Sequence, residues 1–555
     1  MTTLTRHARP LVAALVALTA LASVLSSPAQ AADTSAPLNP TALPSPFPAG
    51  LPGPVTPAFA ISPSVVNLSV SPYQGPAGTR TVITATGLPD NATVTLAWST
   101  SNVTWVVSPQ PDTVNYLGRS ATNLFVTLAT ATTSSTGALR VPLTIPVDFG
   151  GTHDIYAVVN GVAVAHGGFS LTRTLTVTPS SGPVGTPITI TYSGLGATLY
   201  TGGAAVLWDN HYVGEMMANW TRGVATVTIR AAGAVGPHLV QVGDAISYLY
   251  MNIIQSPVPF ANGAAAPFTI TPGHANLSPR IDWPASPTPT INAVTTLSAA
   301  GAPTTDAVAT LSRAHGPVGS STTISVTGLP ADGAYQLSWA SVQGSRVNCP
   351  TSSCWAYIDS PLGSATATGG ELTAPLTVPN GLGGWHVVQV LSGTTLIAQV
   401  PFYVTESLVP FRASDGRLLS LGLATATTST SPAALADGQS GRGTTVFHQG
   451  QEITISLLGV GWTQLDNTLG VDYDNSYIGY GCGFNSNGYT VIHLRATGGP
   501  GVHLIDLYPM LYTQQPSFAN TPYGMTPVLT YAHDFPGLAL GYRVPSFHLA
   551  ITIVK

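Results

Sequence analysis

The chain has 555 residues, which at about 150 residues per domain predicts three to four domains. Charged residues make up only 7% of it, against about 25% in an ordinary soluble domain, and Glu and Lys are too rare for a coiled coil. A hydrophobic fraction of 44% excludes a wholly disordered chain, because disorder requires low hydrophobicity and high charge. The net charge of -5 and the scattered Arg residues argue against nucleic acid as a partner.

The first 31 residues have the pattern of a secretory signal peptide. Arg6 and Arg9 precede an apolar stretch over residues 11–25, and Ala29-Gln30-Ala31 fits a small-x-small cleavage site. The alternative is an N-terminal membrane anchor, but the apolar stretch is short for crossing a bilayer. We therefore expect residues 32–555 to be exported, secreted or held at the cell surface, with no membrane span after signal cleavage.

Four segments of the chain begin and end alike, which indicates an internal repeat. Each begins with a Gly-Pro-x-Gly turn or a degraded form of it, and an alternating run of apolar residues and Thr follows. Each ends in Gly-x-His before another alternating run. Because period-two alternation between Gly and Pro turns is typical of β-strands, we expect an all-β fold. The four openings are at Gly75, Gly182, Gly316 and His448.

The copies are of two types, in the order A-B-A-B. Type A carries a Trp eleven residues after a Gly, at Trp98 and Trp339. Type B carries an aromatic-Asp-Asn-x-Tyr-x-Gly motif, and 29 residues separate its Asp from the His of Gly-x-His in both copies. These matching spacings predict that an A-B pair was duplicated. The expected boundaries are signal peptide 1–31, Pro-rich linker 32–63, A1 64–172, B1 with a tail 173–283, linker 284–308, A2 309–410, Ser/Thr/Ala-rich linker 411–445 and B2 with a tail 446–555.

The repeat resembles bacterial immunoglobulin-like domains of the IPT/TIG type. The resemblance is carried best by residues 178–186, Asp209-Asn210 and Gly236-Pro-His238. It implies four tandem immunoglobulin-like β-sandwiches of roughly 100 residues, as beads or a bent rod. Domains of this kind occur in secreted and cell-surface proteins as spacers, adhesive stalks or modules attached to enzymes.

Two sets of polar residues are candidates for metal binding. One His per copy cannot build a metal site without further ligands, so we expect each Gly-x-His histidine to bond locally at a strand entry. Asp472, Asp474 and Asn475 offer oxygen ligands that suit Ca²⁺. The alternative for Asp-Asn is a hairpin turn, since Asn tolerates positive φ. The histidines are His153, His238, His386 and His503.

Aromatic residues are candidates for stacking on sugar rings. Trp98 and Trp339 recur at one repeat position and are expected in the core, whereas Trp105 and Trp355 lie in less regular stretches and are freer to face a ligand. Tyr473 and Tyr477, in a Tyr-rich stretch that ends at Tyr489, are further ligand-binding candidates. Cys349 and Cys354 are expected to form a disulfide after export, with a metal site as the alternative, and Cys482 is expected to be buried rather than a reactive nucleophile.

No catalytic motif of a known hydrolase or nucleotide enzyme is present, although a Ser-His-Asp triad from distant segments stays open. We therefore expect a non-catalytic surface or matrix protein that self-assembles or acts as a spacer. Its partners would be itself or other cell-envelope components, and no cofactor is expected apart from the Ca²⁺ considered above. The alternatives are an adhesin or carbohydrate-binding protein that contacts surface glycans, and a secreted hydrolase of unrecognised type.

Overall fold

A computed structural model describes residues 40–555 except 48, 111–112, 199–200, 244–262, 286–301, 346–353, 410–444, 485 and 513–524. The expected signal peptide, Cys349 and the side chain of Cys354 lie outside the described residues, so the disulfide stays a prediction. Among the described residues the named elements are β-strands, apart from the short 3-10 helix η4 (Pro536–Leu540). No helix in these ranges is both long and apolar enough to cross a membrane. The prediction of an all-β fold is confirmed.

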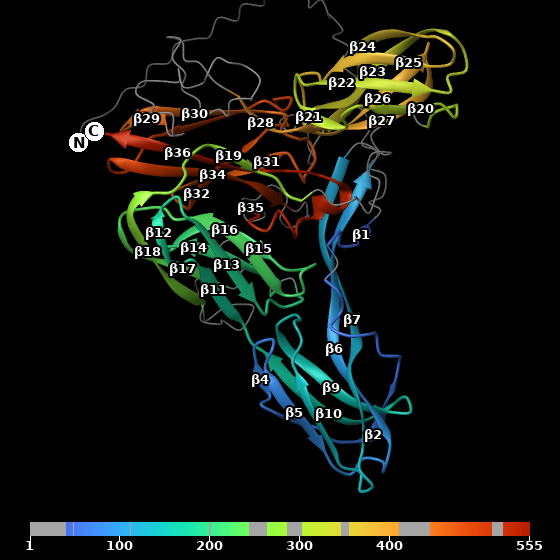
Figure 1. Cartoon of the computed structure of the whole chain (residues 1–555), viewed down its shortest axis with the longest axis vertical. Helices are drawn as coiled ribbons and strands as arrows, with labels where there is room; N and C mark the ends of the chain where they lie inside the picture. Colours follow the sequence, from blue (N-terminus) through green and yellow to red (C-terminus); the bar gives the residue numbers. More distant parts are fainter. Residues whose placement is uncertain are drawn as a thin grey trace, which may run out of the picture. The chain divides into compact units, whose positions relative to one another are not determined.

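A1 is a sandwich of two sheets (Figure 1). The small sheet has the order β3-β5-β8, and the large sheet has the order β1-β6-β9-β10-β2 with β7 on β6 and β4 on β10. β2 and β4 run parallel to β10, whereas β6, β7 and β9 form antiparallel pairs. The strands are β1 (Thr41–Leu43), β2 (Ala60–Asn67), β3 (Ser69–Ser71), β4 (Gln74–Gly75), β5 (Arg80–Ala85), β6 (Thr93–Gln110), β7 (Thr113–Thr132), β8 (Leu139–Thr144), β9 (Gly151–Val159) and β10 (Val162–Leu171).

B1 and A2 repeat this plan with a three-stranded and a five-stranded sheet each. In B1 the orders are β11-β13-β16 and β12-β18-β17-β14-β15, and in A2 they are β20-β22-β25 and β21-β27-β26-β23-β24. The B1 strands are β11 (Thr174–Thr178), β12 (Ser181–Val184), β13 (Pro187–Ser193), β14 (Gly203–Trp208), β15 (His211–Met217), β16 (Val224–Arg230), β17 (Gly236–Gly243) and β18 (Ala264–His274). The A2 strands are β20 (Val308–Leu311), β21 (His315–Pro317), β22 (Ser321–Thr327), β23 (Gly333–Ser345), β24 (Cys354–Ala367), β25 (Leu372–Thr377), β26 (Gly384–Ser392) and β27 (Thr395–Thr405).

B2 has the same two sheets and takes in two strands from outside its predicted boundaries, β19 from the predicted B1 tail and β28 from the predicted end of A2. The orders are β28-β30-β33 and β19-β36-β34-β31-β32, with β29 on β36 and β35 on β34. The predicted B1 tail ends in β19, which pairs with the B2 strand β36 and so belongs to a B2 sheet. The strands are β19 (Arg280–Asp282), β28 (Ser407–Val409), β29 (Thr445–His448), β30 (Glu452–Leu458), β31 (Thr468–Tyr473), β32 (Ser476–Cys482), β33 (Thr490–Arg495), β34 (Gly501–Tyr512), β35 (Met525–Pro527) and β36 (Ser546–Val554).

In all four copies the first edge of the sandwich is divided between the two sheets. In B1, for example, β11 pairs antiparallel with β13 in the small sheet, and β12 then pairs parallel with β18 in the large sheet. A three-stranded sheet facing a five-stranded one with this connectivity is an immunoglobulin-like sandwich. Alternating sequences place every second side chain inside, as in β25, where buried and exposed residues alternate along all six positions.

One aromatic-histidine stack recurs in every copy. The His of Gly-x-His lies flat against the aromatic residue of the facing strand, with ring centroids 4.2–5.7 Å apart. Its Nε2 lies 2.7–2.9 Å from the carbonyl oxygen of the residue four positions earlier. The prediction that these histidines bond locally is therefore confirmed. The four pairs are Trp98–His153, Trp208–His238, Trp339–His386 and Tyr473–His503.

The Asp-Asn motif of the B copies forms the hairpin turn that was the alternative to Ca²⁺. Asp209 and Asn210 have φ of 50° and 67°, and Asp474 and Asn475 have φ of 49° and 60°. Positive φ at both central residues is the geometry of a two-residue hairpin turn whose twist matches its strands. The Asp side chain in each turn also binds the stacked histidine, with Oδ2 to Nδ1 distances of 2.6 Å and 2.5 Å.

Each A domain meets the following B domain through the same backbone contacts, which we call the A–B joint. In joint one, Gly150 donates its N–H to Leu195 O at 2.8 Å, and Leu195 donates to Gly223 O at 3.0 Å. In joint two, Gly383 donates to Val460 O at 2.9 Å, and Val460 donates to Gly488 O at 3.1 Å. A Cβ on either leading Gly would overlap a backbone carbonyl of the B domain, so both joints require glycine there.

The hydrophobic cores differ in how far they extend. A1 and A2 each have their own apolar cluster, whereas buried residues of B1 and B2 belong to one continuous cluster. That cluster also takes in Trp105 and Tyr116 from the long β6–β7 hairpin of A1. The expectation of separate beads therefore fails for B1 and B2, which are not neighbours in sequence but pack together.

Candidate functional site between B1 and B2

The contact between B1 and B2 is built on the edge strand of B1. The segment after β35 forms a parallel bridge to β15 between Glu215 and Val528, and Leu529 donates its N–H to Glu215 O at 2.8 Å. Thr530 accepts a hydrogen bond from Met217 N at 3.2 Å. The B2 segment therefore covers the backbone of a B1 edge that would otherwise stay unpaired.

A buried ion pair lies at the centre of this contact. The Arg230 guanidinium, at the end of β16, approaches Asp506 of β34 at 2.8 Å. The same guanidinium donates to the carbonyl oxygens of Ile505 at 3.3 Å and Leu549 at 2.6 Å. Asn475, in the B2 turn, donates to Arg230 O at 2.6 Å. Since Arg230 and Asp506 are both buried, each depends on the other for charge compensation.

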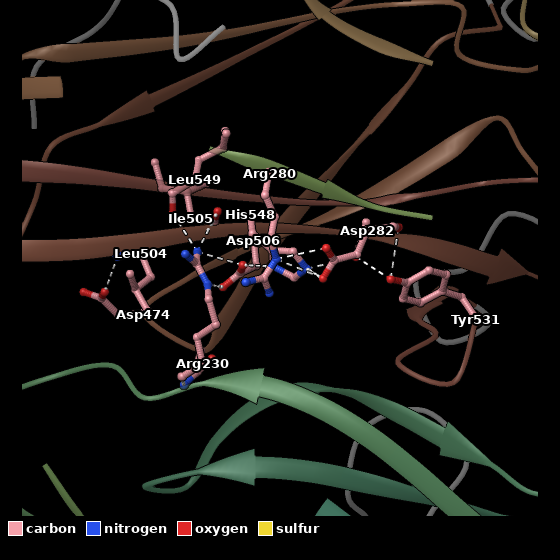
Figure 2. Close-up of polar contacts among 12 residues, drawn as sticks. Arg230, Arg280, Asp282, Asp474, Leu504, Ile505, Asp506, Tyr531, His548 and Leu549 are labelled. Atoms are coloured by element: carbon pink, nitrogen blue, oxygen red, sulfur yellow. Dashed lines mark hydrogen bonds and ion pairs between the residues drawn. The ribbon is translucent and has the colours of Figure 1, made fainter. Parts of the chain in front are cut away.

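His548 extends this pair into a network that reaches β19, as Figure 2 shows. Its Nδ1 lies 2.5 Å from Asp506 Oδ1, and its Nε2 lies 3.2 Å from Asp282 Oδ2 and 3.0 Å from Ser546 Oγ. Asp282 in turn accepts from Arg280 Nε at 2.9 Å and 3.1 Å. The network therefore ties B1, B2 and the strand β19 together.

The charged groups of the network shift one another's pKa values. Burial alone would lower the pKa of His548, but Asp506 and Asp282 outweigh it and the pKa is raised. Burial would raise the pKa of Asp506, but Arg230 and His548 outweigh it and the pKa is lowered. The imidazole is therefore held as a cation between two carboxylates.

Ser546, His548 and Asp506 have the connectivity of a Ser-His-Asp triad, the alternative that the sequence left open. The environment does not suit a general base, because Asp282 also binds Nε2 and the raised pKa of His548 favours the imidazolium. Ser546 has no exposed surface, and its Oγ lies 2.5 Å from the Tyr531 hydroxyl. This geometry stabilises a charge on His548 and does not free a nucleophile.

A pocket of about 620 Å³ opens beside the network. It lies between the outer face of β16 in B1 and the strands β19 and β36 with the segment 529–533 in B2. The lining includes Arg280, Trp283, Tyr508, Tyr531, His533 and His548.

The structure corrects the prediction that Trp105 is free to face a ligand. Trp105 is 0% exposed, and its indole Nε1 donates to the buried Asp534 of B2 at 2.7 Å. The β6–β7 hairpin is long, with strands of 18 and 20 residues, and Trp105 on it belongs to the apolar cluster of B1 and B2 rather than to that of A1. The Trp355 side chain lies outside the described residues.

Tyr473 and Tyr477 both have internal partners. Tyr473 stacks on His503 and donates to Thr497 O at 2.8 Å. Tyr477 packs against its B1 counterpart Tyr212, with ring centroids 6.2 Å apart. Among the described residues of the same stretch, the exposed large hydrophobic side chains are those of Ile478, Tyr480 and Tyr489.

Two of the three predicted calcium ligands, Asp474 and Asn475, are hydrogen-bonded within the protein. Asp474 accepts from Leu504 N at 2.8 Å in addition to its bond with His503, and Asn475 binds Arg230 O. Burial, and then the charge of Asp506, raise the pKa of Asp472 well above its ordinary value, and a neutral acid is a poor Ca²⁺ ligand. No group of three or more His, Cys, Asp or Glu in the described ranges could hold a metal ion. Cys482 is half-buried, less than the sequence predicts.

Sequence reasoning missed Arg230, Asp506 and His548. A signal existed in the comparison of the two B copies, because Asp506 corresponds to Gln241 and Asp472 corresponds to Leu207. An acid that replaces a neutral residue on an alternating strand indicates a special environment. Arg230, the partner of Asp506, corresponds to Arg495 in B2, which is exposed. An arginine at this repeat position therefore does not by itself predict a buried ion pair.

No protein-family model and no curated protein matches the chain. Solved structures that are similar include a Salmonella alpha-2-macroglobulin mutant, with 10% identity over 88% of this chain and a TM-score of 0.15. The chain spans only 31% of that protein's length. The ICAM-5 D1–D4 ectodomain fragment has 13% identity, covers 88% of this chain and 99% of its own, and has a TM-score of 0.15. A putative membrane-anchored protein from Corynebacterium diphtheriae has 14% identity, covers 61% and 90%, and has a TM-score of 0.16. At these scores the fold rests on the chain's own sheet topology.

Proposed function

We propose that the chain is a non-catalytic, exported protein of the cell surface or extracellular matrix, and that its repeats are of the IPT/TIG type. It acts as a structural spacer or as the subunit of a self-assembling layer. The observation that carries this proposal is that the domain contacts are buried and hydrogen-bonded. Both A–B joints use one backbone pattern, and B1 and B2 share a core and a buried ion pair.

A spacer has to keep its domains in place, and these contacts resist separation for a physical reason. Pulling B1 from B2 would expose the apolar residues of their shared cluster to water, which is unfavourable, and would separate Arg230 from Asp506. Opening an A–B joint would exchange the backbone hydrogen bonds of Gly150 or Gly383 for bonds to water.

The β32 edge of B2 supports assembly with further copies. The corresponding edge in B1 is covered by Val528 and Leu529, and the side chains of Val213 and Glu215 there are buried. The equivalent residues of B2, Ile478 and Tyr480, are 52% and 54% exposed. An edge strand with exposed apolar side chains is a site for pairing with another chain.

Sedimentation and negative-stain electron microscopy of residues 32–555 test this proposal. We expect concentration-dependent sheets or fibres that Tyr480→Lys abolishes. The matched control Val235→Lys replaces another exposed apolar residue and should assemble like the wild type. A protein that stays monomeric at high concentration would remove self-assembly and leave the spacer role. Flexible, independently moving domains in the same images would remove the spacer role too.

Glycan binding is a second candidate, which the exposed Tyr480 and Tyr489 favour. Aromatic faces at a surface suit the apolar faces of sugar rings. Tyr489→Ser should weaken retention on immobilised surface glycans without changing the thermal midpoint. Unchanged retention would count against this candidate.

A hydrolase is the remaining alternative. Its catalytic triad would consist of Ser546, His548 and Asp506, which contact one another in that order. We expect a fluorophosphonate probe to leave Ser546 unlabelled, because the imidazolium cannot accept its proton. Labelling that His548→Gln abolishes would contradict the non-catalytic assignment.

A further inference from the structure

The pocket beside the B1–B2 network has the size of a small-molecule site. Its volume of about 620 Å³ lies within the range of ordinary ligand pockets, roughly 300–1,000 Å³. Its walls come from both B domains and from β19, so it exists only where these three elements meet. The structural roles proposed above make no use of it.

Several polar groups of the pocket have no protein partner among the described residues. Arg280 makes its bonds to Asp282 through Nε, which leaves its two terminal amino groups for another acceptor. The Tyr508 hydroxyl is buried in the pocket wall without a hydrogen bond. A buried hydroxyl without a partner is costly, so a ligand or water that supplies one is favoured. His533 also lines the pocket, and none of its hydrogen bonds to described residues involves the ring.

The charges around the pocket favour one negative charge on the ligand. Arg230, Arg280 and a protonated His548 face the two carboxylates of Asp282 and Asp506. Within the network the balance is one positive charge, which a single carboxylate neutralises, and Arg543 adds a second cation beside Trp283. A phosphate dianion on the Arg280 guanidinium would place two negative charges beside the Asp282 carboxylate, where a carboxylate places one.

An apolar surface stands at the same opening. Trp283 is 37% exposed at the pocket wall, and the Arg543 guanidinium lies 5.9 Å from the centroid of its ring. Tyr531 lines the pocket as well. A ligand that fits both surfaces needs a carboxylate, an apolar ring face and several hydroxyl groups.

The geometry points to a binding site for a carboxylated sugar, a uronic acid unit, with its carboxylate on the terminal amino groups of Arg280. The ring face lies against Trp283, and ring hydroxyls bond the Tyr508 hydroxyl and the His533 imidazole. Guanidinium groups bind carboxylates through two parallel hydrogen bonds, which gives both affinity and orientation. This site is separate from the Tyr480 edge, so its failure would leave the proposed function untouched.

Titration of residues 32–555 with D-glucuronate and D-galacturonate, followed by saturation-transfer NMR and calorimetry, tests the site. Three control probes each lack one feature: D-glucose lacks the carboxylate, acetate lacks the sugar ring, and inorganic phosphate replaces the single carboxylate charge with a larger one. We expect a uronate to bind roughly tenfold more tightly than glucose or acetate, and Arg280→Gln to remove that preference. Arg495→Gln, which also removes one positive charge from a B domain, should leave binding unchanged.

Tyr508→Phe is a second test variant that keeps the proposal testable if Arg280→Gln does not fold, since it removes only the hydroxyl. We expect it to weaken uronate binding severalfold while raising or preserving the thermal midpoint, because the unpaired hydroxyl disappears. Equal binding of glucose and uronate, uronate binding that survives both Arg280→Gln and Tyr508→Phe, or tighter binding of phosphate would each overturn the assignment.

Discussion

The two A–B joints have the same backbone contacts and different side-chain interiors. In joint one, Arg222 binds the buried Asp148 at 2.6 Å and also donates to Thr100 at 2.5 Å. The equivalent positions in joint two are Asn487 and Gly381, which carry no charge. Arg222 and Asn487 share a φ of 52°, so the chain path is conserved while the chemistry is not.

Joint two has its buried acids elsewhere. Asp466 accepts hydrogen bonds from the Thr463 N–H at 2.8 Å and hydroxyl at 2.7 Å, and burial raises its pKa to about 7. Burial, together with the charge of Asp466, raises the pKa of the nearby Glu406 well above its ordinary value. Turn geometry and glycine therefore define where an A domain meets a B domain, and the side chains inside the joint are free to diverge.

Removing Arg222 should break joint one selectively. Arg222→Ala leaves Asp148 buried without its cation, and we expect the free energy of unfolding to fall by about 3–5 kcal/mol. Asn487→Ala, at the same φ in joint two, carries a comparable backbone cost without the lost ion pair. Urea unfolding of both variants measures the difference, and equal losses would mean that the ion pair contributes nothing to joint one.

The stability of joint two should depend on pH through the buried Asp466. Because the folded pKa of Asp466 is raised, its stabilisation is complete below the ordinary Asp value near 4 and is lost as pH rises through about 7. Asp466→Asn should therefore stabilise the protein above pH 7, by up to about 4 kcal/mol. Urea unfolding at pH 5 and pH 8 measures this effect, with the exposed Asp90→Asn as control. A gain that is the same at both pH values would contradict the raised pKa.

Adding a methyl group to the leading glycine should damage both joints alike. Gly150→Ala and Gly383→Ala each place a Cβ against a backbone carbonyl, of Gly194 and Gly459 respectively, and we expect a loss of about 1–3 kcal/mol for each. Gly499→Ala is the control, because its Cβ meets no atom within 4 Å. Calorimetry of the three variants checks this, and a loss in only one joint would show that the joints are not equivalent.

The fold followed from the sequence because its signals are local. Alternating strands, the Asp209-Asn210 turn and the Gly-x-His entry to the next strand all depend on residues a few positions apart, and the repeat shows each signal more than once. The core position of Trp98 and Trp339 followed for the same reason, and both are buried.

The B1–B2 contact could not be predicted because its residues are distant and occur once. Arg230 and Asp506 lie 276 positions apart, and no second copy of their contact exists to reveal it. Nothing local in the sequence shows that the hairpin carrying Trp105 extends into another domain. Chain order places β19 with B1, whereas the hydrogen-bonding edge of β36 determines where it pairs.

Amide hydrogen exchange across the B1–B2 contact tests the central claim that these two domains are stabilised by each other. Arg230→Ala should lower the protection of both β16 in B1 and β34 in B2, by about 3–5 kcal/mol, because each loses the packing of the other. Arg495→Ala, at the equivalent exposed position, should change neither. A loss of protection confined to one domain, or no loss at all, would show that B1 and B2 are independent.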